Sequence, residues 1–192
     1  RACFARMAQV QRVIDCIIRA LSPVMPEKVT AGNAATVMSV SFSGFNKTIN
    51  QYWVCVEVNE GSYGARASKD GLDSVDNLMA NTRNVPIEEI ELRYPLRVER
   101  YELRDEPPGA GQYRGGCGHV RAVKFLEDGF FSCNGDRIKE PPFGIFGGKN
   151  GYGARLTMNP ETKNMEELPS KVSGRKVANG TVMKVLGPAS AG

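Results

Sequence analysis

The chain has 192 residues, of which 41% are hydrophobic and 24% are charged, a balance typical of a globular protein with a substantial core. Its 21 glycines and 11 prolines argue against a helical bundle or a coiled coil. The net charge of +4 comes from 25 basic and 21 acidic residues spread along the chain, an excess too small to indicate a nucleic-acid-binding protein.

The five cysteines are scattered and include no Cys-x-x-Cys pair, which argues against a disulfide framework and a zinc ribbon. No apolar run approaches the roughly 18–20 residues that cross a bilayer, and no secretory signal opens the sequence. We therefore expect a cytoplasmic chain without membrane contact. Because it begins at Arg1 within a predicted helix and without an initiator methionine, we expect it to be an internal piece of a longer protein.

The first twenty residues predict an amphipathic helix, because apolar residues from Met7 to Leu21 recur at three- and four-residue spacing. The helix is expected to end near Ser22, since Pro23 disfavours helical backbone in the residue before it. We expect the apolar stripe to pack against the core.

The remainder of the chain predicts strands and loops. Residues 36–42 and 52–58 are rich in β-forming residues and are expected to pair as a hairpin with a long loop. Residues 59–85 have no regular hydrophobic period and predict either a functional loop or a helix that the pattern does not reveal. Further strands are expected at 96–103, 119–126, 130–133, 154–158 and 182–186. The predicted fold class is α+β, an N-terminal helix followed by a β-rich, loop-rich body, as one structural unit over residues 1–192.

The glycine-rich segment 109–118 invites comparison with phosphate-binding loops. It fits neither a Walker loop nor a dinucleotide-binding fingerprint, because Arg114 stands where the fingerprint needs glycine. We interpret the segment as a tight turn between two strands. Arg114 stays a candidate anion ligand, since a guanidinium can bind a phosphate or carboxylate through two hydrogen bonds.

Metal and nucleophile chemistry find little support in the residues. His119 is the only histidine, and one imidazole cannot by itself anchor a metal site. Asp70, Asp73 and Asp76 are spaced to share one face of a helix, but they lack the pattern of a calcium loop, so a solvated or capping role is favoured. Cys117 and His119 would share a strand face, which is too common an arrangement to indicate a catalytic dyad.

Several segments, in the same order, resemble the hydantoinase B/oxoprolinase family. The main ones are Gly-Ser-Tyr-Gly-Ala-Arg at 61–66, Asp-Gly at 70–71, and the stretches at 81–88, 94–104 and 109–116. Shorter matches follow at 135–137, 142–144, 147–148 and 168–171. The resemblance covers nearly the whole chain. Because family members are much longer, it implies the C-terminal half of a hydantoinase B-type subunit, truncated at both ends.

The resemblance implies a subunit of an ATP-dependent, metal-assisted enzyme that acts on a small molecule. A hydantoinase A-type partner would bind ATP and Mg and phosphorylate the substrate, and the B-type subunit would act on the activated species. A divalent metal such as Zn or Mn is expected in the N-terminal half of the B-type subunit, so we expect no metal ligand on this chain. The chain is expected to be inactive alone and to act within a hetero-oligomer.

The reaction stays open at this point. Amidohydrolase members of the family hydrolyse a cyclic amide of the hydantoin or 5-oxoproline type, whereas the acetone and acetophenone carboxylases carboxylate an activated ketone. Many amidohydrolase members carry His-x-His-Met-Thr-Asn-Thr where residues 75–82 of this chain hold no histidine. A non-catalytic assembly subunit is a further alternative.

The candidate substrate- or anion-binding residues lie in the matched loops. They are Arg66, Asp70, Asn81, Thr82, Asn84 and Arg114. The two arginines offer guanidinium groups to a carboxylate or phosphate, and a structural salt bridge from Arg66 to Asp70 or to a neighbouring subunit is equally plausible. The polar residues before Pro86 are expected to form an ordered turn that hydrogen-bonds its own backbone or lines a substrate pocket. The sequence names no catalytic residue.

Overall fold

The computed structural model describes residues 6–59, 61–76, 78, 80 and 82–192. Helix α1 covers Arg6–Leu21 and helix α2 covers Ile87–Arg93. The strands are β1 Met38–Asn46, β2 Gln51–Asn59, β3 Leu96–Leu103, β4 His119–Phe125, β5 Gly129–Asn134, β6 Arg155–Met158, β7 Glu166–Glu167, β8 Lys171–Val177 and β9 Val182–Leu186. Neither helix in the described part of the chain is long and apolar enough to cross a membrane.

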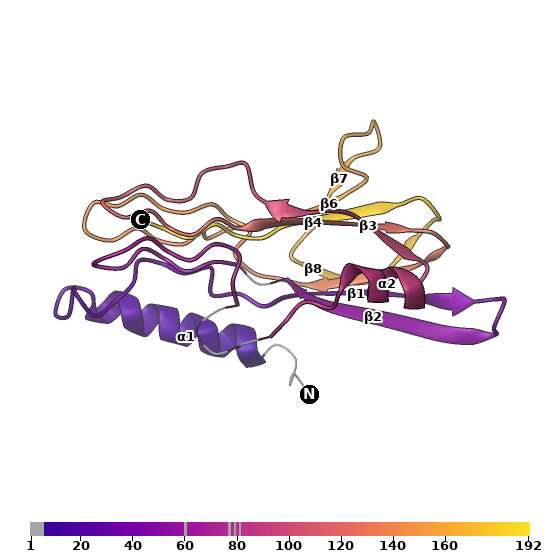
Figure 1. The fold of residues 1–192 in the computed structure, drawn as a ribbon, viewed down its shortest axis with the longest axis horizontal. Coiled ribbons are helices and arrows are strands. Elements are labelled where there is room, and N and C mark those ends of the chain that lie inside the picture. The colour runs from indigo at the N-terminus through magenta and orange to yellow at the C-terminus, as the bar shows by residue number, and fades with distance from the viewer. Residues whose placement is uncertain (1–5, 60, 77, 79, 81) are drawn as a thin grey trace.

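The strands form two antiparallel sheets that stack as layers (Figure 1). One sheet has the order β2-β1-β5-β8 and the other β3-β4-β9-β6-β7. The predicted α+β class is confirmed, and the expected strands are all present. Strand β8 was not predicted, because its residues are mostly polar and exposed and Gly174 interrupts any alternation.

The hairpin of β1 and β2 is tighter than predicted. The two strands pair from Met38↔Asn59 to Asn46↔Gln51, which leaves a turn of residues 47–50. The Asn46 side-chain oxygen accepts hydrogen bonds from the backbone N–H groups of Thr48 and Ile49, and Asn50 adopts a positive φ of 54°. The long loop expected from the sequence is therefore a short turn that Asn46 stabilises locally.

The core lies between the two sheets and is built on aromatic rings. Phe42 packs against Phe131 in its own sheet and against Phe125 of the facing sheet, with ring centroids 5.6 Å apart in each pair. Trp53 and Leu156 add to this cluster. Alternation along each strand sends these apolar side chains inward, which explains why period-two patterns located the strands.

Extended segments lie side by side beyond one end of the sheets, where the C-terminus is also found (Figure 1). They include residues 31–34, 61–65, 114–118 and 187–192, and backbone hydrogen bonds join them. Gly116 N–H donates to the Tyr63 carbonyl at 2.9 Å, and Ser190 N–H donates to the Gly116 carbonyl at 2.9 Å. The interpretation of 109–118 as a tight turn is therefore wrong. The segment is part of a long excursion between β3 and β4.

Gly116 shows why this bundle needs glycine. A Cβ added there would lie 1.9 Å from the Leu72 carbonyl oxygen, inside any allowed contact. We expect Gly116→Ala to lower the free energy of unfolding by about 1–3 kcal/mol, because the neighbouring backbone must move. Chemical denaturation measures this, with Gly111→Ala as the milder comparison because its nearest atom would lie 3.0 Å away. Equal stability of the two variants would contradict the close packing.

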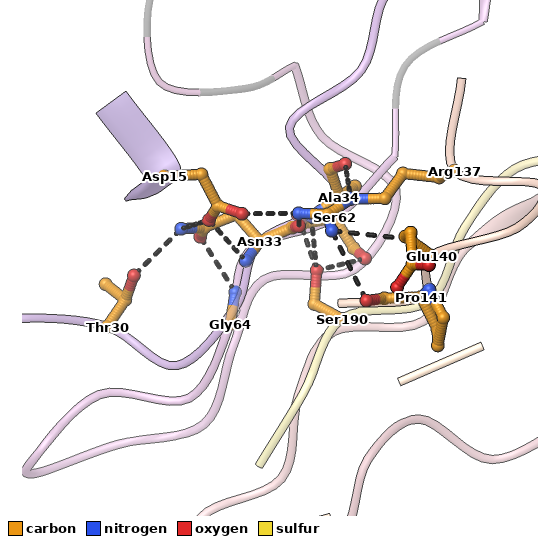
Figure 2. A network of polar contacts seen from close by, with 10 residues as sticks. All are labelled: Asp15, Thr30, Asn33, Ala34, Ser62, Gly64, Arg137, Glu140, Pro141 and Ser190. Carbon is orange, nitrogen blue, oxygen red and sulfur yellow. Dashed lines mark hydrogen bonds and ion pairs between the residues drawn. The ribbon is translucent and has the colours of Figure 1, made fainter. Parts of the chain in front are cut away.

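Helix α1 lies along the extended segments and is held by a buried polar network rather than by its apolar stripe (Figures 1 and 2). The expectation that the stripe packs into the core is wrong for Val13, Ile17 and Leu21, which are 57%, 51% and 39% exposed. The helix instead buries Asp15, whose carboxylate forms an ion pair with Arg137. Asp15 also accepts a hydrogen bond from the Asn33 backbone at 3.2 Å.

Arg137 uses every guanidinium N–H group in this network. Besides Asp15, the acceptors are the backbone carbonyls of Asn33, Ala34, Glu140 and Pro141. Buried charges are tolerated when they are paired and fully hydrogen-bonded, and this one is. The network therefore ties α1 to segments more than a hundred residues away in the sequence.

Candidate active-site cavity

The core between the sheets changes from apolar to polar toward the extended segments. In β2, Glu57 and Asn59 continue the inward-facing series that Trp53 and Cys55 begin. In β4, His119 and Arg121 take the same inward positions as Val123 and Phe125. These four polar residues line a cavity of about 520 Å³, which we call the inter-sheet cavity.

Arg121 is held on two sides. Its Nη2 and Nε donate to the Glu57 carboxylate at 2.5 and 3.4 Å, and both side chains are nearly buried. Tyr101, which pairs with Arg121 across β3 and β4, places its ring 4.6 Å from the guanidinium carbon. Arg121 Nη1 makes no hydrogen bond with the described residues. The guanidinium is thus fixed in orientation, and one terminal nitrogen has no hydrogen-bond partner among the described residues.

His119 is a neutral imidazole. Burial, reinforced by the positive charges of Arg121 and Arg104, lowers the pKa of His119 to about 4. Its Nε2 lies 3.2 Å from Asn59 Oδ1, and its ring meets the Tyr101 ring edge-on at 6.2 Å. When Nε2 is the donor, the Asn59 amide oxygen is the acceptor. The N–H groups of Asn59 Nδ2 then have no acceptor among the described residues.

Loop residues after β2 complete the cavity wall. Thr82 and Asn84, two of the candidates from the sequence, line it together with Asp76 and Arg83. Thr82 donates from its backbone N–H and from its hydroxyl to Asp76 Oδ2, at 2.5 and 2.7 Å, and Asn84 donates from its amide to the Tyr101 hydroxyl. Asn81 lies outside the described residues. The loop is therefore joined to β3 at the mouth of the cavity.

The other sequence candidates form a separate cluster. Asp70 links Arg66, which donates to the Asp70 carbonyl at 2.7 Å, with Arg114, whose backbone N–H donates to the Asp70 carboxylate at 2.9 Å. Arg114 also forms a two-pronged ion pair with Asp73, at 2.7 and 3.0 Å, and this hydrogen bonding keeps the pKa of Asp73 below its usual range. Arg66, Asp70 and Arg114 do not line the inter-sheet cavity.

The helical face considered for the three aspartates does not form. Residues 70–76 run as extended and bent backbone. Asp73 binds Arg114, and Asp76 binds Thr82. The Asp70 and Asp73 carboxylates thus both accept from Arg114, whereas the Asp76 carboxylate accepts from Thr82, because the segment follows the neighbouring extended segments rather than a helix.

The family assignment rests on the whole sequence. The sequence model of the family described as hydantoinase B/oxoprolinase matches residues 1–192. The chain belongs to this family. It is 44% identical, over 189 residues, to a protein of Pseudomonas sp. (strain NS671) assigned as the B-type component of a D-/L-hydantoinase. That match covers 98% of this chain and 31% of the relative, so the chain spans about a third of that protein.

Two solved structures share the fold of this hydantoinase B family chain. An ATP-dependent caprolactamase from Pseudomonas jessenii superposes with a TM-score of 0.63 at 20% identity, over 88% of this chain and 31% of that one. An acetone carboxylase in its nucleotide-free form superposes with a TM-score of 0.59 at 18% identity, over 90% and 27% of the two chains. At these identities the superpositions establish a common fold.

The metal that the family implies does not fit the side chains of this cavity. Among the described residues, no group of three or more His, Cys, Asp or Glu side chains is placed to hold an ion. His119 faces Asn59, and the Glu57 carboxylate is bound by Arg121. Cys117 offers no thiolate, because burial and the nearby Asp73 raise its pKa. The described side chains of this chain therefore do not supply a metal site.

Histidine protonation gives a pH dependence that can be measured. The unfolded chain binds a proton at His119 near pH 6.5, whereas the folded chain binds it only near pH 4. Stability is therefore unaffected by this group above about pH 6.5 and falls as the pH drops toward 4, by at most about 1.4 kcal/mol per pH unit.

Urea denaturation between pH 7.5 and pH 5 tests this, with His119→Gln as the reference. Because His119 is the only histidine of the chain, the wild-type protein should lose more stability than the variant over this range. Parallel losses in the two proteins would mean that His119 titrates normally in the folded state.

The sequence pointed to the loop side of the cavity and missed the strand side. The sequence patterns do not predict a place in the site for Glu57, Asn59, Tyr101 or Arg121, and His119 stands alone as the only histidine of the chain. The signal available in the sequence was a set of polar residues at the inward-facing positions of two strands. Such residues are buried where the sheets pack, so they need partners there.

Proposed function

We propose that this chain forms part of the B-type subunit of an ATP-dependent enzyme that hydrolyses a cyclic amide. We further propose that the residues lining the inter-sheet cavity form part of the substrate-binding site. The observation that carries this proposal is a polar cavity of about 520 Å³ between the sheets, in a chain of the hydantoinase B/oxoprolinase family. A volume of this size suits a small molecule. Residues 1–192 would act as one unit within a longer subunit.

The cavity chemistry suits a substrate that is recognised through hydrogen bonds. Asn59, Asn84 and Thr82 contribute amides and a hydroxyl, and His119 contributes a neutral imidazole. A ring amide presents one carbonyl acceptor and one N–H donor, which such groups match. Phosphorylation of the amide oxygen would make the ring carbon reactive, and the cavity would hold the ring while that carbon is attacked.

The cofactors and partners in this proposal lie outside the described residues. An A-type partner would bind ATP and Mg, and a divalent metal such as Zn or Mn would sit in the N-terminal half of the B-type subunit. The assembled enzyme would be a hetero-oligomer, and we place it in the cytoplasm, where ATP is available. Named subunits among the relatives support a multi-subunit enzyme.

ATP-dependent carboxylation of a ketone is the second candidate reaction. The observation that favours it is the stretch 75–82, which lacks the histidines that the amidohydrolase pattern carries there. Both reactions begin with a phosphorylated oxygen, so the same cavity would serve either substrate.

The test is release of ADP by the complete B-type protein with its A-type partner. With a lactam such as 2-pyrrolidinone or 5-oxoproline, or with hydantoin, we expect ADP release that does not depend on bicarbonate. Consumption of ATP only with a ketone and bicarbonate would replace hydrolysis by carboxylation.

Asn84→Ala in the same complex distinguishes a substrate cavity from a purely structural subunit. The Asn84 side chain is exposed at the mouth of the cavity, so its loss should raise KM and leave the mass of the complex unchanged. An unchanged KM together with an unchanged mass would favour the assembly role. Asn164→Ala, on an exposed turn far from the cavity in sequence, is the matched control.

A further inference from the structure

Two buried side chains of the inter-sheet cavity keep hydrogen-bond donors without acceptors. Arg121 is 4% exposed and Asn59 is 5% exposed, and both line the cavity. Arg121 Nη1 and Asn59 Nδ2 have no partner among the described residues. A buried donor without an acceptor is costly, so such groups are found where a ligand or an ordered water supplies the oxygen.

The two donors lie on neighbouring positions of one polar surface. His119 and Arg121 are two residues apart on β4 and share a face, and Glu57 and Asn59 do the same on β2. The contacts Glu57–Arg121 and Asn59–His119 join these faces. The groups without partners on this surface are donors, from the guanidinium and the amide, because the Asn59 amide oxygen already faces His119.

The charges around the cavity favour a ligand without a net charge. The charged side chains that line it are Glu57, Asp76, Arg83 and Arg121, whose formal charges cancel, and His119 is neutral. Arg121 is already neutralised by Glu57. A carboxylate bound to Arg121 would lie beside the buried Glu57 carboxylate, and two like charges in a poorly solvated site repel strongly.

We propose that Arg121 Nη1 and Asn59 Nδ2 bind the carbonyl oxygen of an uncharged cyclic amide, and that the site disfavours ring amides that carry a carboxylate. Glu57 is the positioning residue, because it fixes the guanidinium through Nη2 and Nε and leaves Nη1 for the ligand. This inference rests on the proposed function and specifies the substrate class of the same cavity.

The experiment measures binding separately from turnover in the complete B-type protein with its partner. Isothermal titration calorimetry at pH 7.5 compares 2-pyrrolidinone, which is uncharged, with 5-oxoproline, which adds a carboxylate to the same ring. Arg121→Lys keeps a cation for Glu57 but removes the second guanidinium branch. Asn59→Asp keeps an oxygen for His119 but replaces the Nδ2 donor.

Matched controls are Arg175→Lys, at an exposed ion pair with Glu166, and Asn164→Asp, at an exposed turn. We expect each cavity variant to weaken 2-pyrrolidinone binding by tenfold to a hundredfold, since each removes a hydrogen bond to a buried group, and the controls to bind as the wild type does. The wild type should bind 2-pyrrolidinone at least tenfold more tightly than 5-oxoproline. Thermal denaturation confirms that each variant is folded.

Wild-type affinity in both cavity variants would overturn the assignment of the two donors, and equal or tighter binding of 5-oxoproline would overturn the preference for an uncharged ring. In either case ADP release with a lactam would leave the proposed function standing. Failure of the proposed function has a different signature, which is ADP release with a ketone and bicarbonate and with no lactam.

Discussion

Replacing Arg137 with methionine is expected to lower the free energy of unfolding by about 3–5 kcal/mol, because it leaves the Asp15 carboxylate buried without its partner. Asp15 and Arg137 are 4% and 9% exposed, so water cannot take over the lost interactions. The backbone carbonyls that Arg137 binds would also lose their donors. Urea denaturation monitored by circular dichroism measures the change.

Arg175→Met is the matched control for this prediction. Arg175 pairs with Glu166 at 2.6 Å, but both side chains are more than 40% exposed, so less than about 1 kcal/mol should be lost. The double variant Asp15→Leu/Arg137→Met should be more stable than Arg137→Met alone, since it removes the unpaired charge. A loss at Arg137 no larger than the loss at Arg175 would mean that the network does not hold α1 in place.

Phe131→Ala is expected to cost about 3–5 kcal/mol of stability, whereas Phe130→Ala on the same strand should cost less than about 1 kcal/mol. Phe131 is fully buried in the core and packs against Phe42, whereas Phe130 points to the opposite face and is 42% exposed. The removed atoms are the same in the two variants, so the difference isolates burial. Denaturation midpoints of the two variants provide the measurement, and equal losses would contradict the assignment of the inner face of β5.

Most of the regular elements were predictable because their signals are local, with β7 and β8 as the exceptions among the strands. Alternating apolar residues located β3 and β9 to the residue, and the spacing of apolar residues located α1. The packing of α1 was not predictable in the same way. Its apolar stripe pointed to the core, but Asp15 anchors the helix through Arg137, a partner 122 residues away in the sequence.

The sequence only weakly predicts the bundle of extended segments. The glycines of 109–118 predict a turn because turns are the commonest use of glycine clusters. Gly116 serves a different purpose, since it permits the Leu72 carbonyl to approach closely. The segment that approaches a glycine can lie far away in the chain. The local sequence around the glycine therefore does not reveal this contact.

The candidate site was half predictable. Family motifs placed Thr82 and Asn84 in a functional loop, and the structure places them at the cavity. Arg121 and Asn59 belong to strands and have the spacing of core residues, so their role emerges only when β2 and β4 are brought face to face. The buried ion pair of Glu57 and Arg121 forms only when the two sheets pack together, so neither strand's sequence predicts it alone.

The most direct test of a substrate site between the sheets is a structure of the complete protein with a bound ring amide. Cryo-electron microscopy of the assembled enzyme with 2-pyrrolidinone should show the ring between β2 and β4, with its carbonyl oxygen within hydrogen-bond distance of Arg121 Nη1. A ring bound elsewhere in the enzyme, with the inter-sheet cavity left to solvent or filled by another protein segment, would contradict this account.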